Sequence, residues 1–399
     1  MSYYSYLECS KCGKKYSKDE PHNLCECGGP LLVRYDFDEI KKMVDKNIFK
    51  TRKKGLFRFK ELLPIDDENN IVTLGEGDTP ITEARTLGRR IGFENLYIKD
   101  EGLNPTGTFK ARGAAVGVSK AKELGIKTIA MPTAGNAGGA WSAYSAKAGI
   151  KLVVAMPQDA PELAKKEAYI YGAKTYLVKG LISDAGKIIS RGVKKHGWFD
   201  AATLKEPYRI EGKKTMGIEI AEYFDWEFPD SILYPTGGGV GIIGIWKAFN
   251  ELRQLGWIKD KIPKLISVQA EGCNPIVKAF NKKKDVSEFC SGANTIAGGI
   301  RVPKALGDFI VLDAIKKSGG TAVQVKDSEI LDSINLIART EGLFICPEGA
   351  ALVAAVEKLR KSNFLKSNEK IVLLNTGSGL KYPNLVSEKL PVIEIDNDI

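Results

Sequence analysis

The sequence predicts an α/β protein with two open, mostly parallel twisted sheets and helices on both faces, preceded by a small N-terminal zinc-ribbon-like module. Three observations lead to this prediction. From residue 96 onward, apolar runs alternate with glycine-bearing turns and helical stretches, as in βαβ units. Four cysteines cluster within the first thirty residues. The 399 residues, 43% of them hydrophobic, suffice for two or three domains with substantial cores.

The N-terminal cysteines form the pattern C-x-x-C followed by C-x-C, made by Cys9, Cys12, Cys25 and Cys27. Two short knuckles can present four thiolates tetrahedrally, and in an intracellular chain this spacing favours zinc over disulfides. The single residue inside the second knuckle is tighter than the usual two. An empty or redox-labile pair of knuckles is therefore the alternative. We expect the module to span residues 1–35.

The regular elements follow in chain order. A strand at 31–35 and a charged amphipathic helix at 38–46 come first. A first series of strands and helices is expected at 96–99, 109–124, 128–132, 137–147, 151–157, 160–171, 175–178 and 182–195. A second series is expected at 210–224, 231–234, 240–255, 264–269, 305–317, 321–325, 328–341, 348–361 and 370–374. The four strand–helix units of the first series predict one parallel sheet.

Lys110 is the candidate reactive group. It follows a turn at 104–107 and lies near the start of the helix expected at 109–124, where Thr106 or Thr108 can cap the first N–H groups. A buried ammonium near a helix N-terminus loses hydration and meets an unfavourable dipole. We therefore expect a lowered pKa and a neutral amine that can form a Schiff base. The alternative is an ordinary surface lysine, since the chain holds 59 Lys plus Arg.

Three glycine-bearing loops follow expected strands, at the edge where open sheets bind ligands. The loop 133–139 offers backbone N–H groups and Asn136, which suit a carboxylate or phenolate-like oxygen; a plain tight turn is the alternative. The loop 236–241 can wrap a phosphate at a helix N-terminus, and it lacks the patterns typical of nucleoside-triphosphate and dinucleotide loops. The loop 375–379 offers the hydroxyl of Thr376, although such hydroxyls are more often self-capping.

A lysine, an anion-binding loop, an asparagine loop and a hydroxyl loop together suggest pyridoxal phosphate. Lys110 would form the Schiff base, Asn136 would meet the ring hydroxyl and Thr376 would meet the ring nitrogen. The cofactor phosphate would be held by Gly237, Gly238, Gly239, Val240 and Gly241. A hydroxyl partner does not require a protonated ring nitrogen, which favours elimination and replacement over transamination.

The net charge of +10 permits an anionic partner. The positive charge is scattered, and no basic stripe is interleaved with aromatic residues, which favours a small phosphorylated or carboxylate ligand over nucleic acid. No signal peptide is recognisable, and no apolar run approaches the roughly 20 residues of a membrane helix. We therefore expect a cytoplasmic protein with neither a nucleic-acid partner nor a membrane partner.

Five segments, NPTGTFKARG, TAGNAGG, PYRIEGKKT, PTGGGVG and NTGSGLKYP, resemble the threonine synthase branch of the tryptophan synthase β-like, fold type II pyridoxal-phosphate enzymes. The resemblance runs from about Leu74 to Pro383. The cysteine module resembles the N-terminal extension of archaeal-type members. This resemblance implies a large cofactor-binding domain at 36–105 and 206–399, a small α/β domain at 106–205, and a homodimer.

The resemblance also implies a reaction: elimination of the γ-phosphate of O-phosphohomoserine, followed by addition of water at Cβ to give threonine. Lys110 would carry the cofactor and shuttle the α-proton. The substrate carboxylate and the cofactor hydroxyl would be held by Thr133, Gly135, Asn136 and Ala137. The substrate phosphate would meet Arg209, Lys214 and Arg112, where arginine offers a bidentate fork and lysine a point charge.

Three positions differ from the family's pattern: Ala111 stands where Asp is common, Thr203-Leu204-Lys205 replaces an Asn-Ser pair, and Ser378 stands where His is frequent. We expect these changes to lie near the substrate. A related β-replacement or dehydratase activity on O-phosphoserine, serine or threonine, such as a cysteate synthase-like activity, is the enzymatic alternative. A non-catalytic binding protein is the other. We expect loss of the cysteines to spare the chemistry, since nothing in the sequence links the module to the loops.

Overall fold

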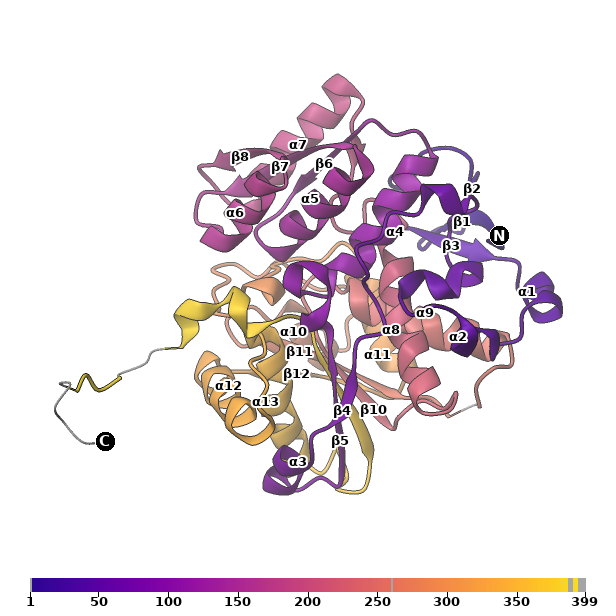
Figure 1. The fold of residues 1–399 in the computed structure, drawn as a ribbon. Coiled ribbons are helices and arrows are strands. Elements are labelled where there is room, and N and C mark those ends of the chain that lie inside the picture. Colours follow the sequence, from indigo (N-terminus) through magenta and orange to yellow (C-terminus); the bar gives the residue numbers. More distant parts are fainter. Residues whose placement is uncertain (1, 260, 387–389, 394–399) are drawn as a thin grey trace.

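A computed structural model describes residues 2–259, 261–386 and 390–393, and these residues form three sheets (Figure 1). The N-terminal sheet is antiparallel, with the strand order β2-β1-β3. Its strands are β1 (Tyr4–Cys9), β2 (Lys15–Tyr16) and β3 (Leu31–Tyr35). Apolar side chains of this sheet, among them Leu7 and Val33, belong to the same buried core as the main body. The module is therefore packed onto the rest of the protein.

The largest sheet has six strands in the order β12-β11-β10-β13-β5-β4. Its strands are β4 (Ile81–Glu83), β5 (Asn95–Asp100), β10 (Ser231–Pro235), β11 (Lys264–Ala270), β12 (Thr321–Val325) and β13 (Lys370–Asn375). All pairs are parallel except β4 with β5. The second α/β sheet is parallel throughout and has the order β8-β7-β6-β9. It contains β6 (Thr128–Pro132), β7 (Lys151–Pro157), β8 (Lys174–Val178) and β9 (Phe199–Asp200).

The two mostly parallel sheets confirm the predicted fold class, but one strand assignment was wrong. The strand expected at 96–99 does not share a sheet with the three strands that follow it. It is β5, which pairs in parallel with β13 from the far end of the chain, Leu96 opposite Ile371. The segment after β5 then carries the chain across to the four-stranded sheet. The sequence of a short apolar strand does not indicate which of two sheets the strand joins.

Helices cover both α/β sheets, as Figure 1 shows. Those before and around the smaller sheet are α1 (Phe37–Met43), α2 (Ile48–Thr51), α3 (Arg85–Ile91), α4 (Lys110–Glu123), α5 (Asn136–Ala148), α6 (Glu162–Ile170) and α7 (Ile182–His196). Those that follow are α8 (Arg209–Tyr223), α9 (Val240–Gln254), α10 (Pro275–Asn281), α11 (Asp308–Lys317), α12 (Asp327–Glu341) and α13 (Pro347–Lys361). No helix in the described part of the chain is long and apolar enough to cross a membrane.

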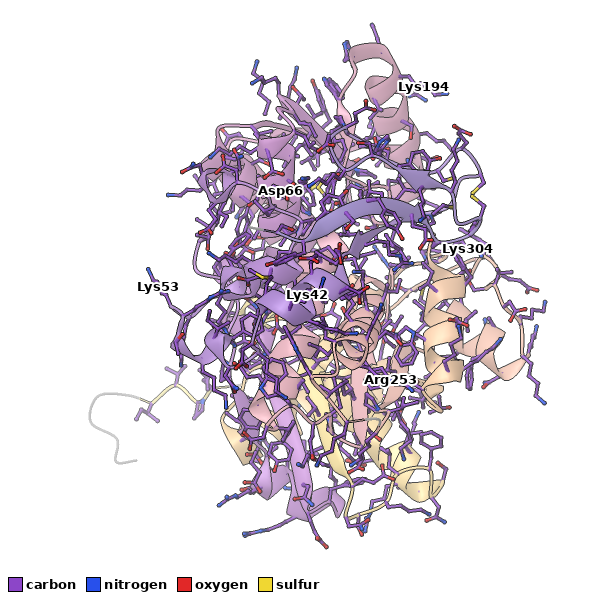
Figure 2. All side chains as sticks on the ribbon, turned by 90° about the vertical axis from the view of Figure 1, so that its right-hand side faces the viewer. Lys42, Lys53, Asp66, Lys194, Arg253 and Lys304 are labelled. Carbon is purple, nitrogen blue, oxygen red and sulfur yellow. The ribbon has the colours of Figure 1, made fainter. Side chains whose placement is uncertain are left out.

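Charged side chains spread over the outside of the molecule. In Figure 2 the labelled residues Lys42, Lys53 and Lys194 lie far apart on the face shown and come from different parts of the chain.

Helices α4 and α8 pack backbone against backbone because glycines face each other. A Cβ at Gly212 would lie 2.0 Å from the carbonyl oxygen of Arg112, and one at Gly113 would lie 3.1 Å from Lys213 Cε. Any larger residue at either glycine would push the helices apart. The approach brings the first turns of both helices to one place.

A buried ion network locks this contact. The Arg112 guanidinium donates to Glu101 at 2.6 and 2.8 Å and to Glu219 at 2.6 and 2.7 Å, and Lys99 Nζ reaches Glu219 at 2.6 Å. All four side chains are 5% exposed or less. Burial disfavours the charge on Glu219, but Arg112 and Lys99 hold the pKa of its carboxyl below the ordinary value. The network ties β5 and α4 to α8.

We predict that Arg112→Ala destabilises the protein by about 3–5 kcal/mol, because two buried carboxylates lose their main partner. Urea unfolding measures the change. The matched control is Arg85→Ala, which removes an exposed arginine paired with Glu83 and should have little effect. Equal stability of the two variants would show that the network does not hold the helices together.

Candidate active site

One cavity of about 740 Å³ lies between the two α/β sheets, within the size range of small-molecule sites. It is lined at the carboxyl ends of strands from both sheets, by Pro132 after β6, Pro157 at the end of β7, Pro235 at the end of β10 and Thr376 after β13. This is where the strand-end rule places ligands in open α/β sheets.

Lys110 is the first residue of α4 and lines this cavity. The Thr108 hydroxyl accepts from its backbone N–H at 3.3 Å, so Thr108 is the capping residue of the two suggested. Desolvation lowers the pKa of Lys110 to about 8, and the positive charge of Arg209 contributes to the decrease. The direction expected from the sequence is confirmed. A substantial fraction of the amine is neutral near physiological pH.

The glycine loop lies opposite, at the N-terminus of α9. Within the described residues, no acceptor is bonded to the N–H groups of Gly237, Gly238 or Gly239. A Cβ at Gly237 would lie 2.8 Å from the Gly299 carbonyl oxygen, and Gly239 has a φ of +79°. Free amides beside a helix N-terminus, in a loop that only glycine can form, fit a phosphate group. Val240 also lines the cavity.

Gly241 does not line the cavity and has a different role. A Cβ there would lie 2.1 Å from the Tyr234 hydroxyl oxygen. The glycine therefore admits the Tyr234 ring under the start of α9. The expected contact of Gly241 with the cofactor phosphate is replaced by this packing role.

Asn136, at the start of α5, lines the cavity from the smaller sheet. Its amide donates to the Tyr382 hydroxyl at 3.0 Å, and that hydroxyl lies 3.1 Å from Glu348 Oε1. Glu348, at the start of α13, also accepts from the Gly299 N–H at 2.6 Å. Asn136 is thus oriented by a chain of hydrogen bonds that crosses from one sheet to the other.

Thr376 lines the cavity at the end of β13, beside Cys346. Its hydroxyl lies 3.7 Å from the Cys346 sulfur. That contact is long and weak, so the hydroxyl retains the capacity to bond a ligand. Burial raises the pKa of Cys346 well above its ordinary value, which disfavours its thiolate form.

Arg209 begins α8 and lines the cavity with its guanidinium fixed on one side. Its Nε donates to Glu206 and its Nη2 to the Ala201 carbonyl, while Nη1 lies 3.5 Å from the Thr203 hydroxyl. The ring of Trp141 lies 4.9 Å from the guanidinium carbon. The arginine is therefore preoriented for an anion in the cavity.

Two residues expected at the substrate phosphate lie elsewhere, and these placements are corrected. Arg112 is fully buried and its guanidinium is bound by Glu101 and Glu219. Lys214 is fully buried, and its ammonium lies 2.6 Å from Glu211 and 2.7 Å from Glu251. Neither side chain lines the cavity. Both project from the faces of their helices that pack inside the protein.

Lys213 takes the place expected for Lys214. It lies one helical turn after Arg209 on the same face of α8, lines the cavity, and donates to the Phe109 carbonyl. Its Nζ and that of Lys110 each lie 4.2 Å from the centre of the Phe109 ring. Burial lowers the pKa of Lys213 well below its ordinary value, and the charge of Lys110 lowers it further. The i, i+4 spacing from Arg209 was the sequence signal for this residue.

The remaining expected residues divide into two groups. Thr133, Gly135 and Ala137 line the cavity as the loop 133–139 was expected to do. Ala111 is fully buried in the core and Ser378 caps a short helical turn by accepting from the Leu380 N–H at 3.2 Å. Neither lines the cavity. These two differences from the family's pattern are therefore not in contact with the site, contrary to expectation.

The four N-terminal cysteines also come together. Their sulfur atoms all lie within 4.8 Å of one another, with separations of 3.4 Å for Cys9–Cys27 and 3.6 Å for Cys12–Cys25. Four thiolates around zinc at about 2.3 Å would have sulfur–sulfur separations near 3.8 Å. Gly13 and Gly28, each with a φ of +74°, turn the chain after the second cysteine of each knuckle. The donor set fits a tetrahedral metal ion.

Comparison with known proteins gives the family. Residues 72–377 match the family model described as pyridoxal-phosphate dependent enzyme. The threonine synthase of Methanocaldococcus jannaschii is 40% identical over 98% of this chain and 97% of its own length. The chain belongs to the pyridoxal-phosphate-dependent enzymes of the threonine synthase family. The threonine synthase of Methanosarcina acetivorans is 39% identical over 96% of this chain and 93% of its own.

Solved structures share the fold. Maize serine racemase superposes with a TM-score of 0.66 at 21% identity, covering 75% of this chain and 88% of that one. At that identity the likeness concerns the fold alone. The resemblance noted from the five segments is confirmed, and pyridoxal phosphate is the cofactor of the family. The cavity contains free amides, an amine with a lowered pKa and a hydroxyl that suit it.

We predict that cofactor attachment to the apoenzyme follows the titration of Lys110, with a midpoint near pH 8. The neutral fraction of such an amine rises from about a tenth at pH 7 to about nine-tenths at pH 9. Stopped-flow absorbance at fixed cofactor concentration measures the rate. A rate that keeps rising to pH 10.5 would mean an amine with an ordinary pKa.

Borohydride reduction followed by peptide mapping identifies the attached lysine. Two amines with lowered pKa values, those of Lys110 and Lys213, lie beside the same ring. We expect the cofactor on the peptide containing Lys110, because it is the lysine that begins a helix opposite the glycine loop. Attachment to the peptide containing Lys213 would show that Lys213, and not Lys110, carries the cofactor.

Proposed function

We propose that this chain makes L-threonine from O-phospho-L-homoserine, a small anionic amino acid. The observation that carries the proposal is a pair of basic side chains that line the cavity apart from the glycine loop and could bind a second anion. Arg209 and Lys213 form this pair on one face of α8. A cofactor phosphate on the loop leaves these two side chains for a substrate phosphate. The curated relatives named threonine synthase support the same reaction.

Each wall of the cavity would have a separate task. The amides of residues 237–240 would hold the cofactor phosphate, Asn136 the ring hydroxyl and Thr376 the ring nitrogen. Thr133, Gly135 and Ala137 would orient the substrate carboxylate. When bound, pyridoxal phosphate supplies an electron sink that makes the hydrogen on the amino-bearing carbon Cα acidic and, once that proton is removed, those on Cβ as well. The amine of Lys110, with its lowered pKa, would accept the proton from Cα and return it.

Arg209 and Lys213 would act on the leaving group. Arg209 offers Nη1, the nitrogen that its contacts with Glu206 and Ala201 leave available, to a phosphate oxygen. Phosphate binding would favour the protonated form of Lys213, since an anion stabilises the ammonium. The pair would then stabilise the charge that accumulates on the departing phosphate. Departure of the phosphate from Cγ would accompany loss of a proton from Cβ. Water would then supply the hydroxyl group at Cβ, and Cγ would take up a proton to become the methyl group.

The main alternative is β-replacement or dehydration of O-phosphoserine, serine or threonine, because these reactions share proton removal from Cα. Incubation of the holoenzyme with each substrate decides between them. We expect threonine and inorganic phosphate from O-phosphohomoserine. Inertness toward it, together with a keto-acid or sulfonate product from another substrate, would contradict the proposal. Absence of the cofactor's absorbance would instead favour a non-catalytic binding protein.

Lys213 and Lys214 make a matched pair for the leaving-group assignment. We predict that Lys213→Gln raises KM for O-phosphohomoserine about tenfold or more, since one charge-assisted contact to phosphate is lost. Lys214→Gln should leave KM nearly unchanged and lower stability, because its ammonium pairs with buried Glu211 and Glu251. Steady-state kinetics and urea unfolding separate the two. A raised KM in Lys214→Gln with an unchanged KM in Lys213→Gln would instead assign Lys214 to the substrate phosphate.

Several finer features also belong to the proposal. Cys9, Cys12, Cys25 and Cys27 would hold a structural zinc ion. The domains would be 1–35, then 36–105 with 206–399, and 106–205, a division supported by the three separate sheets. The enzyme would work in the cytoplasm as a homodimer. Metal analysis and sedimentation of the purified chain test the zinc and the dimer.

A further inference from the structure

The cysteine module is in direct contact with the segment that orients Arg209. Asn23 lies between the two cysteine knuckles, and its side-chain amide donates to the carbonyl oxygens of Asp200 at 2.8 Å and Lys205 at 2.9 Å. Only the NH₂ group of an asparagine can serve two carbonyl acceptors, which fixes the orientation of this side chain. This link has no signal in the sequence, and it reaches the segment before α8 rather than one of the three glycine-bearing loops.

The contacted segment, residues 200–206, contains a backbone conformation that needs support. Leu204 has a φ of +62° although it is not glycine. Its side chain is 1% exposed and packs against Gly307. A Cβ atom at Gly307 would lie only 2.4 Å from the Leu204 side chain. A bulky residue in the left-handed region is strained and persists where the surrounding structure holds it. The two acceptors of Asn23 lie on either side of Leu204, so one side chain clamps both ends of the turn.

The same segment supplies every hydrogen-bonding partner described for the Arg209 side chain. Nε donates to Glu206, Nη2 donates to the Ala201 carbonyl and Nη1 lies 3.5 Å from the Thr203 hydroxyl. A guanidinium that offers one nitrogen, Nη1, to a phosphate must be held in one orientation. The position of residues 201–206 therefore sets the direction in which Arg209 faces the cavity.

Asn23 is itself anchored to the cysteine cluster. The Tyr16 hydroxyl donates to the Cys25 sulfur at 3.2 Å, and the Tyr16 ring packs edge-on against His22, with ring centres 5.0 Å apart. His22 is the neighbour of Asn23, and Cys25 follows two residues later. A metal ion that holds the four sulfurs together would hold Asn23 in place as well.

We propose that Asn23 is a positioning residue for Arg209, through which the cysteine module sets the affinity of the cavity for the substrate's phosphate group. This inference rests on the proposed function, because it assigns the phosphate to Arg209. The module thereby gains a role in binding beyond stabilising the fold. A loose module would leave the residues that bind the cofactor in place and loosen one wall of the phosphate site.

The test compares the wild-type holoenzyme with two variants, Asn23→Ala and Asn23→Asp. The aspartate keeps the size of the side chain but has no N–H to donate. We expect both variants to raise KM for O-phosphohomoserine about tenfold, with kcat within twofold of wild type. The inhibition constant of inorganic phosphate should rise by the same factor. A variant that merely folded less well would lower kcat at unchanged KM, and that result would overturn the proposal.

Two further readouts do not depend on turnover. Hydrogen exchange of the backbone amides in residues 200–206 should accelerate in both variants, while metal content stays at the wild-type level. Asn95→Ala is the matched control, since Asn95 donates to the Asn368 carbonyl at 3.3 Å near the amino end of β5, away from the cavity. Unchanged exchange and unchanged KM in the Asn23 variants would refute the role of Asn23.

The outcome for the wild type separates this inference from the function it rests on. If the wild type makes threonine and the Asn23 variants match it, only the inference fails. If the wild type makes no threonine, calorimetric titration with inorganic phosphate still compares the phosphate site of the variants with that of the wild type. If the wild-type holoenzyme neither makes threonine nor binds phosphate, both proposals fail.

Discussion

The buried pairing of Arg112 with Glu101 and Glu219 is the interaction on which the site depends. It joins the segment after β5, the start of α4 and the middle of α8, all without access to water. The first residue of α4 is Lys110 and the first residue of α8 is Arg209. A network that breaks at high cost thus fixes the reactive amine relative to the arginine proposed to bind the substrate's phosphate. Arg112, which was expected to bind substrate, instead holds together the helices that carry Lys110 and Arg209.

Local sequence patterns predicted the elements and their loops, because strand ends, glycine turns and helix starts are determined by residues adjacent in the sequence. The three glycine-bearing loops and Lys110 reach the cavity as expected. Pairing across the chain was not predictable in the same way. The partner of β5 is β13, whose paired residues lie 275 positions later in the chain. The face of α8 that meets the cavity was predictable only by counting helical turns from Arg209, which gives Lys213 rather than Lys214.

The residues missed by the sequence act across the boundary between sheets. Tyr382 and Glu348 orient Asn136 from the opposite wall, and Asn23 reaches from the cysteine module to the turn before α8. Each contact joins segments more than thirty residues apart, which no local pattern specifies. The cavity therefore combines a glycine loop that sequence alone identifies with walls that only tertiary packing defines.

The central claim is that two phosphate sites exist in one cavity, one on the glycine amides and one on Arg209 and Lys213. A crystal structure of the holoenzyme soaked in inorganic phosphate tests this most directly. The account predicts the cofactor phosphate on residues 237–240 and a second phosphate between the side chains of Arg209 and Lys213. A cofactor phosphate bound to Arg209, or a second phosphate bound away from both cations, would contradict it.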